Sequence, residues 1–362
     1  MTVSNPYTSL TDQAFWKTAV ANRRPREITG LWKPKFEIKK QDTIATAGSC
    51  FAQHIGRALK VRGYNWHDSE PAPLLMHLNK EKSTLFNYGI FTFRTGNIYT
   101  VALLKQWIDW SLGKALPPEE IWQSPENRYY DLFRPNIEPN GFKSAEEALK
   151  SRQSTLKAIK RSLAKTDLFI FTLGLTEAWV NSRGQYVYPM CPGTLAGNFD
   201  PSQHQFKNFG FLEVYTSLNT VLDTLKTINP TMRFLLTVSP VPLTATASNE
   251  HVVTATIHSK SILRAVAGEL KIAREDTDYF PSYEIISAFP FKAVFYAENM
   301  RNVLPQGVNF VMNSFFNCQE RAFGTQTEQI PQQALVQSNT QTSIKKSSDE
   351  VCEDALLEAF KK

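Results

Sequence analysis

Two neighbouring side chains with nucleophilic chemistry, Ser49 and Cys50, follow a short apolar run at residues 44–47. Gly48 separates the run from the pair, and glycine permits a tight turn at that position. A serine hydroxyl or a cysteine thiol can attack an ester carbonyl when a neighbouring group removes its proton. At the start of a helix, the partial positive charge of the backbone also favours a thiolate or an oxyanion. The pair therefore predicts a site at a sharp turn that favours a thiolate or an oxyanion.

The sequence on either side of this pair predicts the elements that hold it. The run at residues 44–47 is typical of a buried central strand. After the turn, apolar side chains recur at helical spacing and share one face: Phe51, Ala52, Ile55 and Leu59. Residues 43–62 therefore predict strand, turn and helix. The pair then lies at the carboxyl edge of a sheet, where open α/β folds bind ligands.

The alternation of predicted strands and helices continues along the chain. Three further apolar runs are typical of strands: residues 168–173, 233–239 and 278–280. Helical patterns occur in four segments, the first of which ends in a loop: residues 101–125, 144–165, 208–228 and 250–270. Ser144 and Glu147 have the spacing of a capping box at the start of one helix. The order predicts an α/β fold with a doubly wound, mostly parallel central sheet and helices on both faces.

Polar residues directly after the strand predicted at 168–173 form a second candidate group. Thr176 could donate its hydroxyl to an oxyanion, and Glu177 could orient a base or bind a substrate hydroxyl. A carboxylate in the first turn of a helix, favoured by the helix dipole, is an equal interpretation of Glu177. Both interpretations place these side chains at the same sheet edge as Cys50.

Composition limits the classes of function. The chain has 362 residues, of which 42% are hydrophobic, which is enough for a large core. The formal charge is +6, but basic residues are scattered and do not alternate with aromatic ones, so nucleic-acid binding is not expected. No segment approaches the ~20 apolar residues of a membrane span. Four cysteines lack metal-ligand spacing and predict thiols in a reducing cytoplasm, without a metal or cofactor: Cys50, Cys191, Cys318 and Cys352.

Changes in composition along the chain predict three parts. Residues 1–42 are expected to form an arm packed on the body, and residues 43–324 the α/β domain. Residues 325–362 form a polar, flexible tail in which a short terminal helix could occur. Within the domain, residues 180–207 are rich in proline and glycine and are expected to form a long loop, of the kind that often covers a site.

Several separate blocks together resemble the GSCFA family, which is related to the SGNH/GDSL hydrolases. Residues 48–52 read Gly-Ser-Cys-Phe-Ala, and four further blocks match along the chain: residues 95–100, 240–243, 259–264 and 281–285. A gapless overlay on the Gly-Asp-Ser-Leu block of the hydrolases puts Cys50 on the nucleophilic serine. The resemblance therefore implies Cys50 as nucleophile, with Ser49 as the alternative, on an SGNH-hydrolase-like, flavodoxin-like three-layer fold.

The resemblance also implies oxyanion and substrate contacts. In SGNH enzymes a glycine of the second block donates a backbone N–H to the oxyanion, and Gly96 is the candidate here, with Gly89 as the alternative. Residues 174–177 resemble the third block, Gly-x-Asn-Asp. The resulting candidates for binding the oxyanion or the substrate are Gly48, Gly96, Asn97, Gly174, Thr176 and His54.

The sequence departs from the SGNH pattern near its end. SGNH enzymes take their base from a late Asp-x-x-His, whereas here Asn299 stands at the acid position and no histidine follows His258. His251 could supply the base from another loop, and His54, one helical turn beyond Cys50, is the alternative. A cysteine with a low pKa needs less help from a base than a serine, because the thiolate exists before attack.

The function implied by the resemblance is an esterase or O-acyltransferase that acts on an O-acyl ester, such as an acylated glycan, through a covalent acyl-enzyme. The alternative is a catalytically inactive protein of the same fold that binds a glycan or a protein partner. The oligomeric state is not indicated by the sequence.

Overall fold

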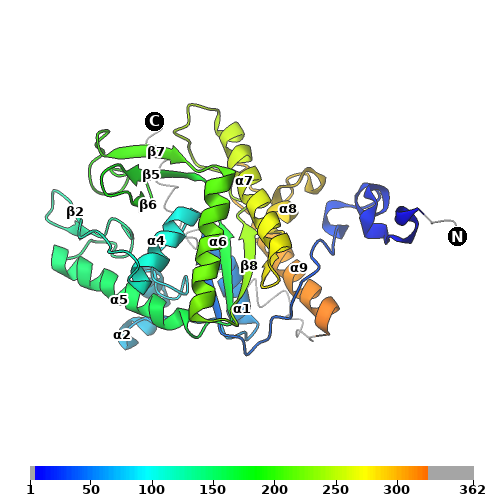
Figure 1. The fold of residues 1–362 in the computed structure, drawn as a ribbon, viewed down its shortest axis with the longest axis horizontal. Helices are drawn as coiled ribbons and strands as arrows, with labels where there is room; N and C mark the ends of the chain where they lie inside the picture. The colour runs from blue at the N-terminus through cyan, green and yellow to red at the C-terminus, as the bar shows by residue number, and fades with distance from the viewer. Residues whose placement is uncertain (1–4, 325–362) are drawn as a thin grey trace. The chain divides into compact units, whose positions relative to one another are not determined.

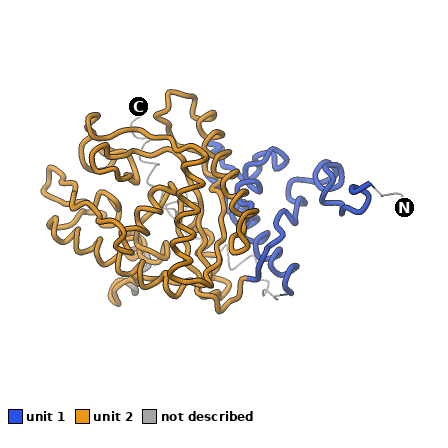
Figure 2. The backbone as a smooth tube through the Cα atoms, viewed as in Figure 1, with its two compact units in different colours: residues 1–37, 280–327 blue, residues 38–279, 328–362 orange. Residues whose placement is uncertain are grey.

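The computed structural model describes residues 5–324, which fall into two compact units (Figure 2). Unit 2 comprises residues 38–279, and unit 1 joins residues 5–37 to residues 280–324. The polar tail and terminal helix predicted at 325–362 lie outside the described residues.

A four-stranded, all-parallel sheet forms the centre of unit 2, in the order β1-β4-β8-β9 (Figure 1). Its strands match the predicted runs: β1 (Ile44–Gly48), β4 (Leu168–Leu173), β8 (Arg233–Val238) and β9 (Thr277–Tyr279). Every residue of β1 and β4 is buried, which explains their apolar runs. Gly48 pairs with Thr172, so β1 and β4 end almost together.

A further segment lies along the edge of β1 opposite to β4. Trp66 forms a parallel bridge with Ile44, whose N–H donates to Asn65 O at 3.0 Å and whose carbonyl accepts from His67 N at 2.9 Å. The sheet therefore extends in both directions from β1. Such a reversal is the topological switch point at which open α/β sheets bind ligands.

Helices flank this sheet, as predicted. The longer helices of unit 2 are α1 (Ala52–Val61), α4 (Val101–Leu112), α5 (Ala145–Leu163), α6 (Phe211–Ile228) and α7 (Val252–Ala273). In the view of Figure 1, α6 crosses in front of the sheet, beside α4 and α7. From β1 the chain crosses in one direction to the segment of Trp66, and later strands follow in the opposite direction. Because both kinds of crossover are right-handed, α1 lies on the face of the sheet opposite to α6. The three-layer α/β prediction is confirmed.

The helix ends follow the local sequence. Thr100 caps α4, where its hydroxyl oxygen accepts from Leu103 N at 3.2 Å. Ser144 caps α5 and accepts from Glu147 N at 3.1 Å. The Glu147 carboxylate accepts from Lys143 N, one residue before the cap, so the capping box is shifted by one position. Two short helices, α2 (Leu74–His77) and α3 (Lys80–Leu85), lie in the turn-rich segment before α4.

The segment expected to be a long loop, residues 180–207, also contributes to a small sheet. This sheet is three-stranded and antiparallel, in the order β6-β5-β7: β5 (Glu177–Asn181), β6 (Val187–Tyr188) and β7 (His204–Asn208). Trp179 of β5 pairs with both Tyr188 and Phe206. These strands are only two to five residues long and their connections carry the prolines and glycines, so the loop prediction holds for the connections and missed the short strands. A hairpin of β2 (Trp122–Gln123) and β3 (Tyr129–Tyr130) precedes α5.

A buried charged cluster joins the segment after β3 to α5. Asp131 lies 2.7 Å from Arg134 Nε and 2.7 Å from Arg152 Nη2, and all three side chains are at most 1% exposed. Arg134 also donates to Thr155 Oγ1 at 2.7 Å. Burial alone would raise the pKa of Asp131, but the two guanidinium groups outweigh it and lower the pKa. We call these three residues the Asp131 cluster.

Unit 1 has its own aromatic core. The ring of Trp32 lies 5.1 Å from Phe280 and 5.1 Å from Phe315. Its helical elements are η1 (Pro6–Ser9), η2 (Asp12–Ala14), η3 (Lys17–Ala21), η4 (Pro25–Glu27), α8 (Ser282–Ser287), η5 (Phe289–Phe291) and α9 (Pro305–Phe323). Among residues 5–324, no helix combines the length and the apolar content needed to cross a bilayer.

Candidate functional site

The turn after β1 requires the glycine at its start. Gly48 has φ +136°, a conformation that side chains rarely adopt. A Cβ atom at this position would clash with the backbone of Thr172 and lie 2.7 Å from its nitrogen. The Ser49 N–H then donates to Thr172 O at 3.1 Å. Gly48 therefore lets the chain leave β1 while it stays against the end of β4.

Ser49 lies in this turn with an unsatisfied hydroxyl. The residue is 2% exposed, and its Oγ has no hydrogen-bond partner. A Cβ atom on Gly174 would lie 3.0 Å from Ser49 Cβ, so the serine lies against the turn that follows β4. Leaving a buried hydroxyl unpaired costs about 1–3 kcal/mol, and such groups in native proteins need an explanation.

Cys50 follows in the same turn and is equally buried, with 2% of its surface exposed. The N–H of Ala52 donates to Ser49 O at 2.9 Å, and that of Gln53 donates to Cys50 O at 3.1 Å. These tight bonds start α1 directly after the pair. The predicted arrangement of strand, turn and helix is confirmed, with Cys50 just ahead of the positive end of the helix dipole.

The block at residues 95–100 lies against this turn. Ile98 N donates to Gly48 O at 2.8 Å, two residues after Gly96, which has φ +72°. Asn97 between them is 1% exposed. Gly89, the alternative to Gly96, has its carbonyl bound by Lys60 Nζ near the far end of α1. The contact with Gly48 therefore favours Gly96 as the backbone donor of the second block.

Backbone groups after β4 are already paired. The N–H groups of Gly174 and Leu175 both donate to Tyr99 O, at 3.1 and 2.9 Å. A side chain on Gly174 would lie 2.9 Å from the same oxygen. Gly174 therefore contributes close packing between Tyr99 and Ser49, and its N–H is held away from an oxyanion.

Thr176 is 1% exposed and bonded at three atoms. Its N–H donates to Ser259 Oγ at 3.0 Å, its carbonyl accepts from Phe209 N, and its hydroxyl donates to Asn208 Oδ1 at 2.7 Å. The hydroxyl would have to leave Asn208 before it could donate to an oxyanion.

Glu177 begins β5, so its interpretation as a residue in the first turn of a helix is wrong. Its Oε1 accepts from Thr246 Oγ1 at 2.7 Å, which directs the carboxylate toward the segment after β8. Burial raises the pKa of Glu177, against the lowering effect of the Thr246 hydroxyl. A carboxyl group with a raised pKa beside a sheet edge is a feature of acid–base sites.

The two candidate imidazoles occupy different places. His54 lies on the first turn of α1, with its ring 5.3 Å from that of Phe51. His251 is exposed and caps α7, where Nδ1 accepts from Val253 N at 3.2 Å. Ser259, which contacts Thr176, follows eight residues later, or about 12 Å along the helix axis. His251 therefore begins the helix well away from the turn after β4, and its role as a base stays a prediction.

One residue of this region was missed in the sequence. Lys260 of α7 is 1% exposed, and its Nζ donates to Gly174 O at 2.7 Å. A signal was present, because Lys260 falls at helical spacing with the buried Leu263 and Ala267. A charged residue within an apolar stripe indicates a buried charge, which proteins rarely contain unless it is paired.

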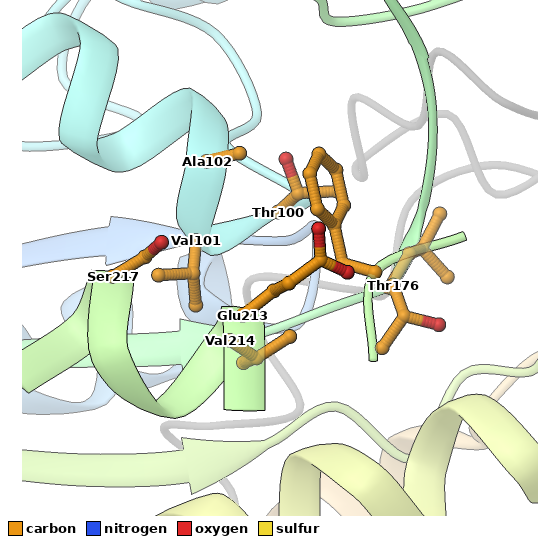
Figure 3. A pocket seen from close by; sticks show the side chains of 9 residues that line it. Thr100, Val101, Ala102, Thr176, Glu213, Val214 and Ser217 are labelled. Atoms are coloured by element: carbon orange, nitrogen blue, oxygen red, sulfur yellow. The ribbon is translucent and has the colours of Figure 1, made fainter. Parts of the chain in front are cut away.

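A small cavity lies at the same sheet edge. Its volume is about 10 Å³, room for one water molecule. Figure 3 shows Glu213 reaching from α6 towards Thr100 at the start of α4 and Thr176 after β4. A wider hollow of about 420 Å³ lies elsewhere, within the loop at residues 191–199.

The other described thiols belong to other segments, Cys191 to the loop at residues 191–199 and Cys318 to α9. Burial raises the pKa of the Cys191 thiol to about 11 and also raises that of Cys318. Both are therefore poor nucleophiles at neutral pH. His204 accepts from Asp200 N through Nδ1. Within residues 5–324, no three His, Cys, Asp or Glu side chains are grouped so that they could hold a metal ion.

Comparison with known proteins gives one result. The model of the GSCFA family matches residues 43–315, which include the turn after β1, the 95–100 block, the end of β4 and all of α7. No curated protein and no solved structure matches the chain.

Proposed function

The chain belongs to the GSCFA family, and from this premise we propose that it is an acyl-transfer enzyme of the SGNH type. It would act as an esterase or an O-acyltransferase through a covalent acyl-enzyme. The observation that carries the proposal is the turn of Gly48, Ser49 and Cys50. It holds two nucleophile types between a buried strand and a helix N-terminus, at the switch point of the sheet.

In the proposed first step, Cys50 Sγ attacks the carbonyl carbon of an ester, and Ser49 Oγ is the alternative nucleophile. A lone pair on the nucleophile forms the new bond, the proton of the nucleophile passes to a base, and the π electrons of the carbonyl move to the carbonyl oxygen. The intermediate then re-forms the carbonyl and breaks the ester C–O bond. The leaving alkoxide takes the proton from the base. Water, or a hydroxyl of an acceptor, attacks the acyl-enzyme in the same way and regenerates the nucleophile.

The proposed oxyanion donors are backbone N–H groups at Cys50 and Gly96. The bond from Ile98 N to Gly48 O supports Gly96, since it brings this block to the turn. Thr176 is a weaker candidate, because its hydroxyl is bonded to Asn208. His251 and His54 remain the proposed bases, and Glu177 a proposed orienting or substrate-binding group.

The proposed substrate is an O-acyl ester, with an acylated glycan as the first class to examine. A cytoplasmic location is proposed because Cys50, Cys191 and Cys318 are not joined in disulfides. A non-catalytic protein that binds a glycan or a partner is the second candidate. It is favoured by the 2% exposure of both Ser49 and Cys50, since a substrate must reach the nucleophile.

The test is turnover of short-chain aryl esters by the full chain and by three variants: Cys50→Ala, Cys50→Ser and Ser49→Ala. Under the proposal, Cys50→Ala lowers kcat/KM at least about 100-fold and Ser49→Ala lowers it less. Full turnover in Cys50→Ser together with none in Ser49→Ala would assign the nucleophile to Ser49. Absence of turnover in the wild type, with every ester tried, would favour the binding protein.

A further inference from the structure

The first part of the chain is folded but has no core of its own. Residues 5–24, here called the N-terminal segment, contain the helical elements η1, η2 and η3, none of which buries a residue. Residues 5–17 are all exposed, and Ile28 is the first buried residue of the described chain. Ordering a backbone costs free energy at every residue, and burial of apolar surface is the main term that offsets it. Within residues 5–324 this offset is absent for the segment, which points to a cover supplied from outside.

Large apolar side chains are exposed on the N-terminal segment: Tyr7, Leu10, Phe15 and Trp16. Trp16 is 57% exposed, and its ring stacks at 5.5 Å on that of Phe289, which is 78% exposed. Single exposed apolar residues are common on protein surfaces, whereas a group of them marks an interaction site. Phe15, Trp16 and Phe289, called the aromatic patch below, are therefore candidate contacts with whatever covers the segment.

The charge of the N-terminal segment limits what can cover it. Lys17, Arg23 and Arg24 are exposed basic residues, and Asp12 is the only acidic residue of the segment. Arg23 Nε donates to Thr18 O at 3.2 Å, so this guanidinium group lies beside the chain that follows the aromatic patch. A second copy of the protein would bring the same positive charges against these ones, and like charges repel. The segment therefore favours an anionic surface.

We propose that the N-terminal segment binds an anionic membrane surface, with the aromatic patch in the headgroup region of the lipids. Tryptophan is enriched at membrane–water interfaces, where its apolar ring and its polar N–H each find a matching environment. Lys and Arg side chains are attracted to anionic headgroups. Lipid then supplies the burial that residues 5–324 do not, in a peripheral and reversible contact. The proposal goes beyond acyl transfer, and no step of that chemistry depends on it.

Flotation of the full chain with vesicles tests the proposal. Two compositions are compared, phosphatidylcholine alone and phosphatidylcholine with about one-third phosphatidylglycerol. We expect binding to the anionic vesicles at low salt, and at least about tenfold weaker binding to the neutral ones. Binding to the anionic vesicles should weaken steeply as the salt concentration rises to about 0.5 M, because salt screens the attraction.

The aromatic contribution is tested by the double variant Trp16→Ala, Phe289→Ala. Its affinity for anionic vesicles should fall at least about tenfold through lost apolar contact. Both side chains are exposed, so the fold is kept. The matched control is Ile272→Ala on α7, an apolar side chain that is 76% exposed in unit 2, which should bind like wild type. Vesicles with brominated acyl chains should quench the tryptophan emission of the wild type more than that of Trp16→Phe.

The basic contribution is tested by the double variant Lys17→Gln, Arg23→Gln. Each Lys or Arg near an anionic surface contributes about fivefold in affinity, so this variant should bind about 25-fold more weakly and with less dependence on salt. Arg24 is left unchanged, because its Nη2 pairs with Glu27 at 2.8 Å.

Absence of binding to anionic vesicles at low salt would overturn the proposal. So would equal binding by wild type and both double variants, which would assign the membrane contact to another surface. Sedimentation velocity without lipid tests the remaining occupant. A dimer that dissociates in Trp16→Ala, Phe289→Ala would show that a second copy covers the segment, and would also overturn the proposal. None of these measurements needs ester turnover, so their outcome is separate from that of the proposed enzyme.

Discussion

Two buried polar regions of unit 2 satisfy their hydrogen-bonding groups to different degrees. In the Asp131 cluster, both carboxylate oxygens bind guanidinium groups, and the nitrogens of Arg134 and Arg152 reach further oxygens. At the ends of β1 and β4, by contrast, Ser49 Oγ and Thr172 Oγ1 are buried without a hydrogen-bond partner. Both regions are buried, but only the Asp131 cluster pairs these polar groups within itself.

The difference separates two uses of buried polarity. A fully paired cluster fixes one arrangement of the chain, and breaking it is strongly destabilising. An unpaired buried hydroxyl lowers stability, and proteins keep such local violations mainly at functional sites. The Asp131 cluster is therefore interpreted as structural, and the region around Ser49 as the place where a ligand group would complete the bonding.

The largest expected effect is on the Asp131 cluster. Asp131→Ala should lower the free energy of unfolding by about 3–5 kcal/mol, because two buried guanidinium groups lose their counter-ion. Denaturant unfolding measures this. The matched control is the exposed pair of Glu146 and Lys150, 2.8 Å apart on α5, where Glu146→Gln should change nothing measurable. An Asp131→Ala variant as stable as wild type would contradict the structural interpretation.

The same cluster predicts a pH dependence. The folded pKa of Asp131 is lowered below its ordinary value of 3.8, so its stabilising contribution is present above that pH. The contribution is lost as the pH falls through the lower folded value. The difference in stability between wild type and Asp131→Ala should therefore narrow in acid, and a difference that widened there would contradict this assignment.

A smaller effect is expected at Gly48, the first residue of the turn that holds Ser49 and Cys50. Gly48→Ala should destabilise the protein by about 2–3 kcal/mol, because of its φ of +136° and its contact with the Thr172 backbone. Thermal unfolding measures this, with Gly63→Ala as control, where a Cβ would have open space at φ +72°. Equal costs at both glycines would mean that the close approach to β4 adds nothing to the cost of a positive φ.

Ser49→Ala sharpens the comparison with an effect of opposite sign. Removing an unpaired buried hydroxyl should leave stability unchanged or raise it by up to about 1 kcal/mol. Ser162→Ala, which removes another buried hydroxyl without a partner but on α5, is the control for stability. A loss of more than about 1 kcal/mol in Ser49→Ala would show that the hydroxyl is satisfied in solution and end the contrast between the two regions.

The smallest effect is expected at Glu177. Burial raises its pKa above the ordinary 4.5, so the ionised form present at neutral pH lowers stability. Glu177→Gln should therefore be slightly more stable than wild type at pH 7, and the gain should vanish below about pH 4.5, where both side chains are neutral. If Glu177→Gln were still more stable than wild type by the same amount at pH 4, the gain in stability would have another cause than the Glu177 charge.

The sequence predicted those parts whose pattern is local. The runs at 44–47 and 168–173 have no alternation, because both faces of their strands are covered, and the helix periods follow from one buried face. Strands β5 to β7 escaped prediction because they are short and separated by prolines and glycines. Their pairing depends on Trp179 meeting Tyr188 and Phe206, which no local pattern reveals.

At the candidate site, the sequence located the turn but not its surroundings. Ser49 and Cys50 were found because they interrupt a strand and helix pattern. The hydrogen bonds that hold Thr176 and the two N–H groups on Tyr99 O join distant segments. Lys260 was passed over because a lysine on a helix is usually solvated, although its helical spacing with the apolar Leu263 and Ala267 was a signal of burial.

The bonds from α7 to the segment after β4 also have a kinetic consequence. Ser259 and Thr176 are separated by 83 residues, and Lys260 and Gly174 by 86. Contacts this distant in sequence form late, because a long loop must close before they stabilise anything. The amide of Thr176 should therefore be protected from exchange only while α7 is packed against this segment. In a nascent chain, the segment after β4 would lack both bonds until α7 has been synthesised.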